Sequence, residues 1–279
     1  MNFHELQQQA AAWAAAARPA VVVEVVATRG SAPREAGTRM LVAADAFLGT
    51  IGGGHLEQQA IADARALLGN AGREFRRRVA LGPSLGQCCG GAVDLQHRLL
   101  ADCLPADWPA PAARFHLQLY GAGHVGRAIV RLLAHVPCRV QWIDEREVEF
   151  PLEASPPHIQ RLCVEPVEAE VAHATAGSSF LVLTHSHALD LAITQAVLTR
   201  GDFGFFGLIG SQTKRARFEA RLRERGFDAS QLERLVCPIG LASIVGKEPE
   251  IIAIGVVAQL LQAAAEGFSP QVGGISSDT

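Results

Sequence analysis

A glycine-rich turn near the middle of the chain constrains the fold more than any other feature. The segment Gly121-Ala122-Gly123-His124-Val125-Gly126 follows a predicted strand, Phe115–Tyr120, and leads into a predicted helix, Gly126–Ala134. Glycines at these positions allow a tight turn and let a phosphate approach the helix N-terminus. This context predicts a dinucleotide-binding, Rossmann-like fold, although helix–sheet packing alone would also require such glycines.

The residues after this turn continue the pattern of a parallel sheet. Asp144 ends the next predicted strand, 18 positions after Gly126, where an acid can bind ribose hydroxyls. The candidate nucleotide-binding residues are therefore Gly121, Gly123, Gly126 and Asp144. Strands and helices then alternate, which is typical of a mainly parallel sheet. The predicted strands are Arg139–Asp144, Ile159–Val164, Phe180–Thr184 and Phe203–Ile209, and the predicted helices are Leu189–Thr199, Thr213–Arg225 and Glu248–Ala265.

The first half carries a different pattern, in which a continuous β-branched run is followed by glycine-rich loops. Its predicted strands are Ala20–Ala27, Arg39–Ala43 and Ala92–Leu100, and its predicted helices lie within 1–18 and 57–68. A proline-rich stretch without periodicity, residues 104–114, is the candidate linker. We therefore expect an α/β protein with an N-terminal α/β domain, residues 1–103, and a C-terminal Rossmann-like domain, residues 115–279.

Length and charge exclude several classes of function. A chain of 279 residues suits two domains, and its net charge of −3 gives no basic field for nucleic acid or an acidic membrane. Two basic clusters, Arg76–Arg78 and Lys214–Arg225, would by default be solvated faces, an interpretation we favour for the first. The N-terminal apolar run is too short to span a bilayer and lacks a basic leader. Six cysteines without regular spacing argue against a disulfide framework, so we expect a cytoplasmic protein with free thiols.

Two loops of the second half should lie beside the glycine turn, at the carboxyl ends of parallel strands. In the first, His185 and His187 can reach a common point, and Asp190 could join them in a metal site. We favour substrate or water binding at a polar rim, because no third strong ligand is evident. In the second loop, Ser211 and Lys214 begin a predicted helix and form a candidate anion pocket.

Adjacent cysteines in Gln87-Cys88-Cys89-Gly90-Gly91 are the most informative feature of the first half. Two thiols between glycines and other loop-forming residues suit a soft-ligand site, since thiolates prefer soft or late metals. The alternative is that both are buried and behave as small hydrophobic residues. Two further loops, residues 30–34 and 52–57, share the same small residues, bendable backbone and few polar groups.

At these loops the chain resembles the xanthine dehydrogenase accessory proteins of the XdhC/CoxI family. The first half carries that family's Gly-Ser-x-Pro-Arg loop, Gly-Gly-Gly-His-Leu-Glu turn and Leu-Gly-Gln-Cys-Cys-Gly-Gly segment. The second half matches in Gly-Ala-Gly-His-Val-Gly, Thr-His-x-His-Ala-Leu-Asp, Gly-Leu-Ile-Gly-Ser and Cys-Pro-Ile-Gly-Leu. The resemblance covers nearly the whole chain. It departs from the family at Ser186, where many relatives carry an acid, and in the looser segment 246–249.

The resemblance implies a cytosolic accessory protein and not a turnover enzyme. Such a protein carries the molybdenum cofactor (molybdopterin), assists its sulfuration, and inserts it into apo-xanthine dehydrogenase or a related molybdenum hydroxylase. A cysteine desulfurase is a candidate further partner, and a homodimer is expected. The N-terminal domain would handle the cofactor, with Cys88 and Cys89 as candidate ligands of its molybdenum. The other candidate cofactor-binding residues there are Ser31, Pro33, Arg34, Gly52, Gly53, Gly54, His55, Glu57 and Gln87.

Under this resemblance, the hypothesis for these residues assigns them to different parts of the cofactor. Arg34 and glycine amides would hold the terminal phosphate, and Gln87, His55 and Glu57 would form hydrogen bonds with the pterin.

The rival hypothesis is an NAD(P)-dependent oxidoreductase that uses the glycine turn. No spacing singles out a proton donor for it, so that hypothesis rests on fold analogy. A third alternative is a pure docking protein whose glycine loops only shape a partner surface.

Overall fold

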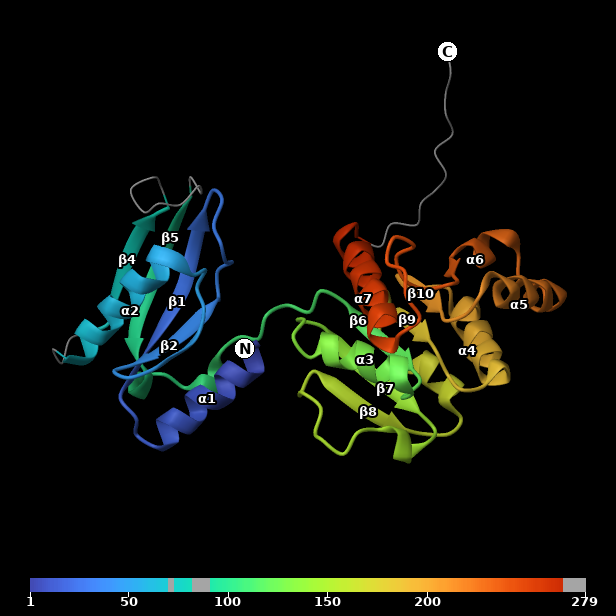
Figure 1. Ribbon diagram of the computed structural model, residues 1–279, viewed down its shortest axis with the longest axis horizontal. Coiled ribbons are helices and arrows are strands. Elements are labelled where there is room, and N and C mark those ends of the chain that lie inside the picture. Colours follow the sequence, from blue (N-terminus) through green and yellow to red (C-terminus); the bar gives the residue numbers. More distant parts are fainter. Residues whose placement is uncertain (70–72, 82–90, 268–279) are drawn as a thin grey trace, which may run out of the picture. The chain divides into compact units, whose positions relative to one another are not determined.

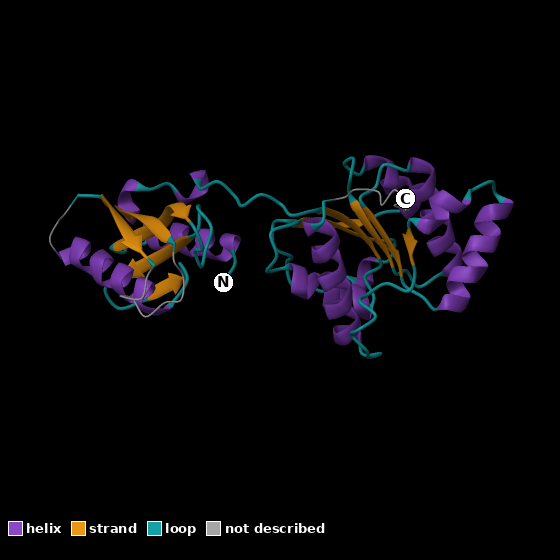
Figure 2. Cartoon of the chain, turned by 90° about the horizontal axis from the view of Figure 1, so that it is seen from above, coloured by secondary structure: helices purple, strands orange, loops and turns teal. Residues whose placement is uncertain are grey.

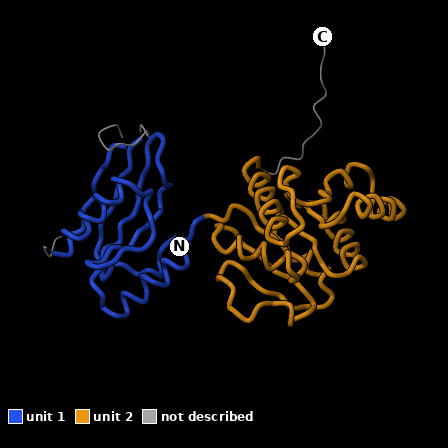
Figure 3. The backbone as a smooth tube through the Cα atoms, viewed as in Figure 1, with its two compact units in different colours: residues 1–111 blue, residues 112–279 orange. Residues whose placement is uncertain are grey.

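The chain divides into two compact units, Met1–Pro111 and Ala112–Thr279 (Figure 3). The computed structural model describes residues 1–69, 73–81 and 91–267. The boundary between the units falls inside the predicted linker, 104–114, but that linker is shorter than we expected. Pro105 and Trp108 are buried in the first unit, where Trp108 packs in the same hydrophobic cluster as Trp13. Prolines without periodicity look like a linker in the sequence even when they lie against a core.

Unit 1 contains a five-stranded antiparallel sheet (Figure 1). Its strand order is β3-β2-β1-β5-β4, with β1 in the centre. The long apolar run of β1 is buried over its first four residues because layers cover both sheet faces there. The strands are β1 (Ala20–Arg29), β2 (Arg39–Ala43), β3 (Phe47–Gly49), β4 (Phe75–Ala80) and β5 (Ala92–Leu99).

Helices cover the two faces of this sheet. Helix α2 (Gly54–Gly69) packs Leu56 and Ala60 on the face formed by alternate residues of β1, β2 and β5. Helix α1 (Phe3–Ala15) lies on part of the opposite face together with two short 3-10 helices, η2 (Leu100–Asp102) and η3 (Pro105–Asp107). Asn2 caps α1 by accepting a hydrogen bond from the Glu5 N–H.

The arginine cluster at 76–78 forms strand β4, which the sequence did not predict. Its residues alternate between the two sheet faces, so Arg77 points toward α2 and pairs with Asp63 at 3.0 Å. Arg78 points to the other face and pairs with Asp94 of β5 at 2.7 Å. Three consecutive arginines are therefore compatible with a strand, because Asp63 and Asp94 pair with two of them and Gln96 accepts a hydrogen bond from Arg76.

His97 gives unit 1 a specific response to acid. The ring is fully buried between the sheet and α2 and stacks on Phe75, with 4.5 Å between the ring centroids. Burial lowers the pKa of His97, although the nearby Asp63 carboxylate and Ala60 carbonyl oppose the shift. The folded protein therefore binds this proton less readily than the unfolded chain, whose histidines titrate near ~6.5. Stability is lost as the pH falls below that value.

We expect His97→Phe to remove part of this pH dependence. The change keeps an aromatic ring beside Phe75 but has no titratable group. Between about pH 7.5 and about pH 5.5, the urea midpoint of the wild type should fall more than that of the variant. His135→Phe alters an exposed histidine and should leave the pH dependence unchanged. Equal slopes for wild type and His97→Phe would rule out this role.

Unit 2 contains a six-stranded parallel sheet with strand order β11-β10-β9-β6-β7-β8. Read from β8, the order in sequence is 3-2-1-4-5-6, which is the Rossmann arrangement. The α/β fold class and the C-terminal Rossmann-like domain are therefore confirmed. The strands are β6 (His116–Tyr120), β7 (Arg139–Asp144), β8 (Ile159–Cys163), β9 (Ser179–Val182), β10 (Phe205–Leu208) and β11 (Leu235–Val236).

Helices lie on both faces of this sheet (Figure 2). Helices α3 (His124–Leu133) and α7 (Pro249–Ala265) pack against one face. The other face is covered by α4 (His187–Arg200), α5 (Gln212–Glu224), α6 (Ala229–Glu233) and the 3-10 helix η5 (Val167–His173), while η4 (Glu147–Glu149) follows β7. Across residues 1–69, 73–81 and 91–267, none of the helices combines the length and apolar character needed to cross a bilayer.

Candidate functional site

Two loops of unit 1 and the residues at the ends of β4 and β5 lie together at one end of its antiparallel sheet (Figure 1), and we call them the loop cluster. The first loop joins β1 to β2 and the second joins β3 to α2, while Leu81 follows β4 and Gly91 precedes β5. Strand register places them together: Arg29 at the end of β1 pairs with Ala92, which also pairs with Ala80 at the end of β4. Met40, at the start of β2, pairs with Gly49 at the end of β3.

Close contacts join these loops, and glycine makes the contacts possible. A Cβ on Gly52 would lie 2.5 Å from Pro33 Cγ, so the second loop touches the first. A Cβ on Gly91 would lie 2.2 Å from the Ser31 carbonyl oxygen and 2.5 Å from that of Arg29. Gly91 also accepts a hydrogen bond of 2.7 Å from the Leu81 N–H. Contacts this close leave no room for a side chain, so both glycines are required for the loops to meet.

Glu57 shapes the second loop from inside. Its Oε2 accepts hydrogen bonds from Thr50 Oγ1 at 2.5 Å, the Ile51 N–H at 3.2 Å and the Gly53 N–H at 3.3 Å. These bonds hold Gly52, Gly53 and Gly54 at positive φ, a conformation that glycine adopts without steric cost. We expected Glu57 to read a ligand, but one of its two carboxylate oxygens is occupied by the loop.

The remaining candidates of unit 1 differ in how they are placed. Ser31, Pro33, Arg34 and His55 are exposed at this end of the sheet. Within the described ranges, neither Arg34 nor His55 has a hydrogen-bond or ion-pair partner. Gln87, Cys88 and Cys89 lie outside the described residues. They belong to the segment between Leu81 and Gly91, and these two flanking residues are part of the loop cluster.

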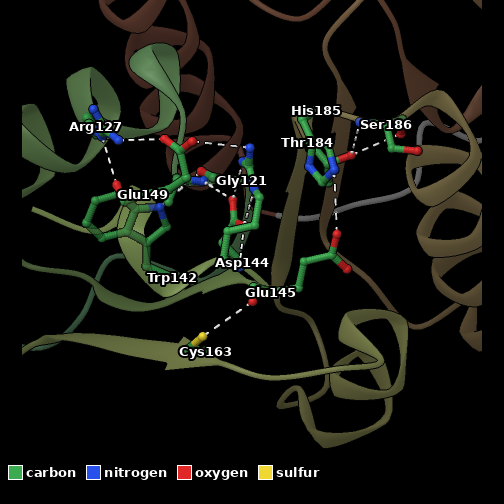
Figure 4. Close-up of polar contacts among 12 residues, drawn as sticks. Gly121, Arg127, Trp142, Asp144, Glu145, Glu149, Cys163, Thr184, His185 and Ser186 are labelled. Atoms are coloured by element: carbon green, nitrogen blue, oxygen red, sulfur yellow. Dashed lines mark hydrogen bonds and ion pairs between the residues drawn. The ribbon is translucent and has the colours of Figure 1, made fainter.

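In unit 2, a second group of polar residues gathers where the strand order reverses, between β6 and β9 (Figure 4). Open α/β sheets bind their ligands at this position. A cavity of about 10 Å³ lies there, lined by Gly121, Asp144, Glu145, Thr184 and His185 among others. It has room for about one water molecule, so a larger ligand would bind at the open edge above it.

Asp144 is fully engaged by the protein itself. Its Oδ2 accepts from the Ala122 N–H at 2.7 Å and from Arg146 Nη2 at 3.0 Å, and its Oδ1 accepts from the Arg146 N–H and Nε at 2.9 and 3.0 Å. Burial by itself would raise the pKa of Asp144, but hydrogen bonds from Arg146 and the Ala122 N–H outweigh it and lower the pKa. Asp144 therefore holds the glycine turn to β7, and a ribose would have to displace Arg146.

The structure requires glycine at two of the three glycine positions of the turn, for different physical reasons. Gly121 has a φ of 120°, and its Cβ would lie 2.4 Å from the Leu183 carbonyl oxygen. A Cβ on Gly126 would lie 2.1 Å from the Gly121 carbonyl oxygen, so it serves helix–strand packing. Gly123 has an ordinary φ of −69°, and a Cβ there would meet nothing within 4 Å. Only Gly123 is therefore free of an internal requirement for glycine.

His185, His187 and Asp190 do not converge on a common point in the structure. His185 Nε2 lies 3.5 Å from Glu145 Oε1, and His187 is exposed at the start of α4. Asp190 is buried, and its Oδ1 accepts from Thr184 Oγ1 at 2.7 Å and the Thr184 N–H at 3.0 Å. The structure therefore gives no support to a metal site built from these three residues. Among the described residues, no group of three or more His, Cys, Asp and Glu side chains is arranged to hold a metal ion.

Lys214 is the internal partner of Asp190. Its Nζ donates to Asp190 Oδ2 at 2.6 Å and to the Ile209 carbonyl oxygen at 2.8 Å. Ser211 Oγ accepts from the Lys214 N–H at 3.2 Å and caps α5. An anion at this helix start would therefore compete with Asp190 for the ammonium group.

Three residues that organise this carboxyl edge of the parallel sheet were not predicted from the sequence. Trp142 donates from Nε1 to the Gly121 carbonyl oxygen at 3.0 Å, Arg146 neutralises Asp144, and Glu145 contacts His185. The run Trp-Ile-Asp-Glu-Arg at the end of β7 could have indicated them, because charged residues directly follow a buried strand there. The four cysteines of the described part, Cys103, Cys138, Cys163 and Cys237, are free thiols.

Together, the fold and these two groups define a two-domain protein with an antiparallel, loop-bearing first domain and a Rossmann-type second domain. Residues 117–260 match the model of the XdhC Rossmann domain, and residues 13–79 match the model of the XdhC and CoxI family. The chain belongs to the XdhC and CoxI family, as its motifs predicted. Membership of this family fits an accessory role.

Two known proteins resemble the chain along most of its length. The Escherichia coli (strain K12) protein YqeB, described as uncharacterized, is 32% identical over 253 residues, which are 88% of this chain and 43% of YqeB. The chain thus spans less than half the length of that relative. A Bacillus halodurans crystal structure described as a xanthine dehydrogenase superposes with a TM-score of 0.69 at 20% identity, covering 96% of this chain and 97% of that one. At this identity the likeness supports the shared fold alone.

Proposed function

We propose that this protein binds the molybdenum cofactor as cargo, assists its sulfuration, and inserts it into apo-xanthine dehydrogenase or a related molybdenum hydroxylase. A cysteine desulfurase would supply the sulfur for the sulfuration step. The protein itself would act as a carrier, and it would work in the cytoplasm, as a homodimer. The single observation that supports this proposal best is the close contact of the β1–β2 loop with Gly52 of the β3–α2 loop and with Gly91, which flanks the cysteine segment.

The chemistry of the loop cluster suits such a cargo. Arg34 is an exposed cation without an internal partner in the described part, so it is available to pair with the terminal phosphate. His55 is exposed at the first turn of α2 and can donate to or accept from the pterin edge. The loop uses only Oε2 of the Glu57 carboxylate, so Oε1 remains available to the cargo. Cys88 and Cys89 would approach the molybdenum as thiolates, which bind soft metals.

Reactivation of a client enzyme tests the proposal. Apo-xanthine dehydrogenase from a cofactor-deficient host should gain activity when mixed with this protein purified from a cofactor-producing host. The same protein purified from the deficient host supplies no cargo and should give no activity. Activation by both preparations, or by neither, would contradict insertion of a carried cofactor.

A nucleotide at the Rossmann turn is the second candidate, because Gly123 has no internal reason to be glycine. In dinucleotide-binding turns, the second glycine lets the backbone approach the pyrophosphate. The N-terminus of α3 also lacks a side-chain cap, which leaves its N–H groups available to an anion. Asp144 is engaged by Arg146, so this observation supports phosphate binding more than hydride transfer from a ribose-anchored NAD(P).

Alanine substitutions in the turn distinguish ligand binding from packing. Gly123→Ala should leave the melting temperature nearly unchanged, because the new Cβ meets no atom within 4 Å. If a nucleotide binds here, the same change should weaken binding of NAD(H), NADP(H) or ATP in calorimetry by roughly tenfold. Gly126→Ala is the packing control and should lower the melting temperature by several degrees. Unaltered nucleotide affinity in Gly123→Ala, or no binding by the wild type, would remove the second candidate.

A further inference from the structure

Helix α5 carries an excess of positive charge that neither domain function uses. Residues 212–225 contain six Lys and Arg side chains and two Glu side chains, a net charge of +4 in a chain of net charge −3. The helix belongs to the β10–β11 edge of unit 2, where Phe218 and Leu222 bury its inner face. Its solvent-facing side therefore holds most of this charge.

Part of the charge has a role inside the protein. Lys214 pairs with Asp190, and Arg215 and Arg223 share Glu219 at 2.7 and 2.9 Å. Three arginines remain, spaced by four residues so that they follow one face of the helix: Arg217, Arg221 and Arg225, called here the arginine stripe. All three are exposed, and no carboxylate among the described residues lies within ion-pair distance of them. Arg225 donates only to the neutral side chain of Gln195.

The arginine stripe does not stabilise helix α5. Like charges four residues apart repel one another and weaken a helix. The first turn of α5 carries no acid, and it includes two cations, which the helix dipole also disfavours. The stripe therefore has a stability cost that nothing in the described part of the chain offsets. Its charge is available to an external partner.

We propose that the arginine stripe docks an acidic patch on a protein partner. This inference rests on the proposed function, under which the partner is the apo-hydroxylase that receives the cargo. A compact acidic patch suits the stripe better than an extended polyanion does. Residues 144–170, which run from the end of β7 through β8 to η5, hold eight acids and two arginines, and this excess of negative charge disfavours binding of nucleic acid.

Electrostatic docking predicts a definite kinetic signature. Charges at an interface rim chiefly raise the association rate, and added salt screens them. The complex should therefore form more slowly at high ionic strength, and its dissociation rate should change less. Cargo binding at the loop cluster of unit 1 does not involve α5 and should be independent of the stripe.

The test compares two charge-reversed proteins of equal net charge. Arg217→Glu/Arg221→Glu should slow association with immobilised apo-xanthine dehydrogenase on the order of tenfold at low salt. It should fold normally, because the new like-charge pair at 217 and 221 replaces an existing one, while the Glu at 221 faces Arg225 at helical spacing. Arg114→Glu/Arg139→Glu alters two exposed arginines before β6 and at the start of β7, and should associate like the wild type.

Pterin fluorescence of the same preparations separates this inference from the proposed function. Normal cargo with slowed docking in the α5 variant supports both. Absence of cargo from the wild type removes the carrier function, yet slowed docking would still support the stripe. Equal association rates for wild type and the α5 variant, or no association of the wild type with the apo-enzyme, would overturn the proposal that the arginine stripe docks this partner.

Discussion

Replacement of Lys214 by methionine should lower the free energy of unfolding by about 3–5 kcal/mol, because it leaves a buried carboxylate without its counter-charge. Asp190 has a side-chain exposure of only 1%, and Lys214 has 10%. The Lys214 ammonium also satisfies the Ile209 carbonyl oxygen, so the substitution leaves two buried acceptors poorly paired. Urea unfolding followed by far-UV circular dichroism measures the loss.

Two further variants test the cause of that loss. Arg217→Met removes an exposed cation from the same helix and should change stability by no more than about 0.5 kcal/mol. Lys214→Met combined with Asp190→Asn removes both charges, and Asn at 190 can still accept hydrogen bonds from Thr184. The double variant should therefore be more stable than Lys214→Met alone. If it is less stable, the ion pair is not what holds these loops.

The second large effect is expected from Gly91→Ala in unit 1. The added Cβ would lie 2.2 Å from the carbonyl oxygen of Ser31 in the first loop and 2.5 Å from that of Arg29 at the end of β1, and backbone cannot move aside as a flexible side chain can. The loops must separate, at a cost of about 1–3 kcal/mol in stability. If the meeting of the loops forms the cargo site, pterin loading should fall well below that of the wild type.

Gly69→Ala is the matched control for this change. It introduces the same methyl group at the end of α2, where nothing lies within 4 Å. Alanine also favours a helix over glycine, so stability should be kept or slightly raised. Full pterin loading in Gly91→Ala, despite the steric clash, would show that the loop contact is not needed for cargo.

Local sequence signals predicted the second domain well. The glycine turn and the alternation of apolar strands with helices depend on neighbours along the chain, and the observed strands follow them closely. Arg139–Asp144 has the predicted bounds, and His124–Leu133 begins two residues before the predicted helix. Strand β4 was missed because its identity depends on partners distant in sequence: Asp63 on α2 and Asp94 on β5 make the arginine run acceptable.

The roles of charged residues were harder to predict for the same reason. Asp144 stands where a ribose-binding acid would, but Arg146 and the Ala122 N–H engage it, and only the folded turn brings that N–H near. Lys214 resembled an anion-binding lysine, yet Asp190, 24 residues earlier, neutralises it. A sequence pattern shows which chemistry is present, whereas tertiary contacts decide which groups remain available to a ligand.

Cargo loading of cysteine variants is the sharpest test of whether Cys88 and Cys89 hold the molybdenum of a carried cofactor. Wild type, Cys88→Ala/Cys89→Ala and Cys163→Ala are purified without oxygen from one cofactor-producing host, and molybdenum and pterin are measured per chain. Cys163 is an exposed thiol of unit 2 and serves as the control. The wild type and Cys163→Ala should carry both molybdenum and pterin, and the double variant should carry far less molybdenum. Equal molybdenum on all three proteins would rule out the cysteines as ligands, and none on the wild type would rule out carriage of the cofactor.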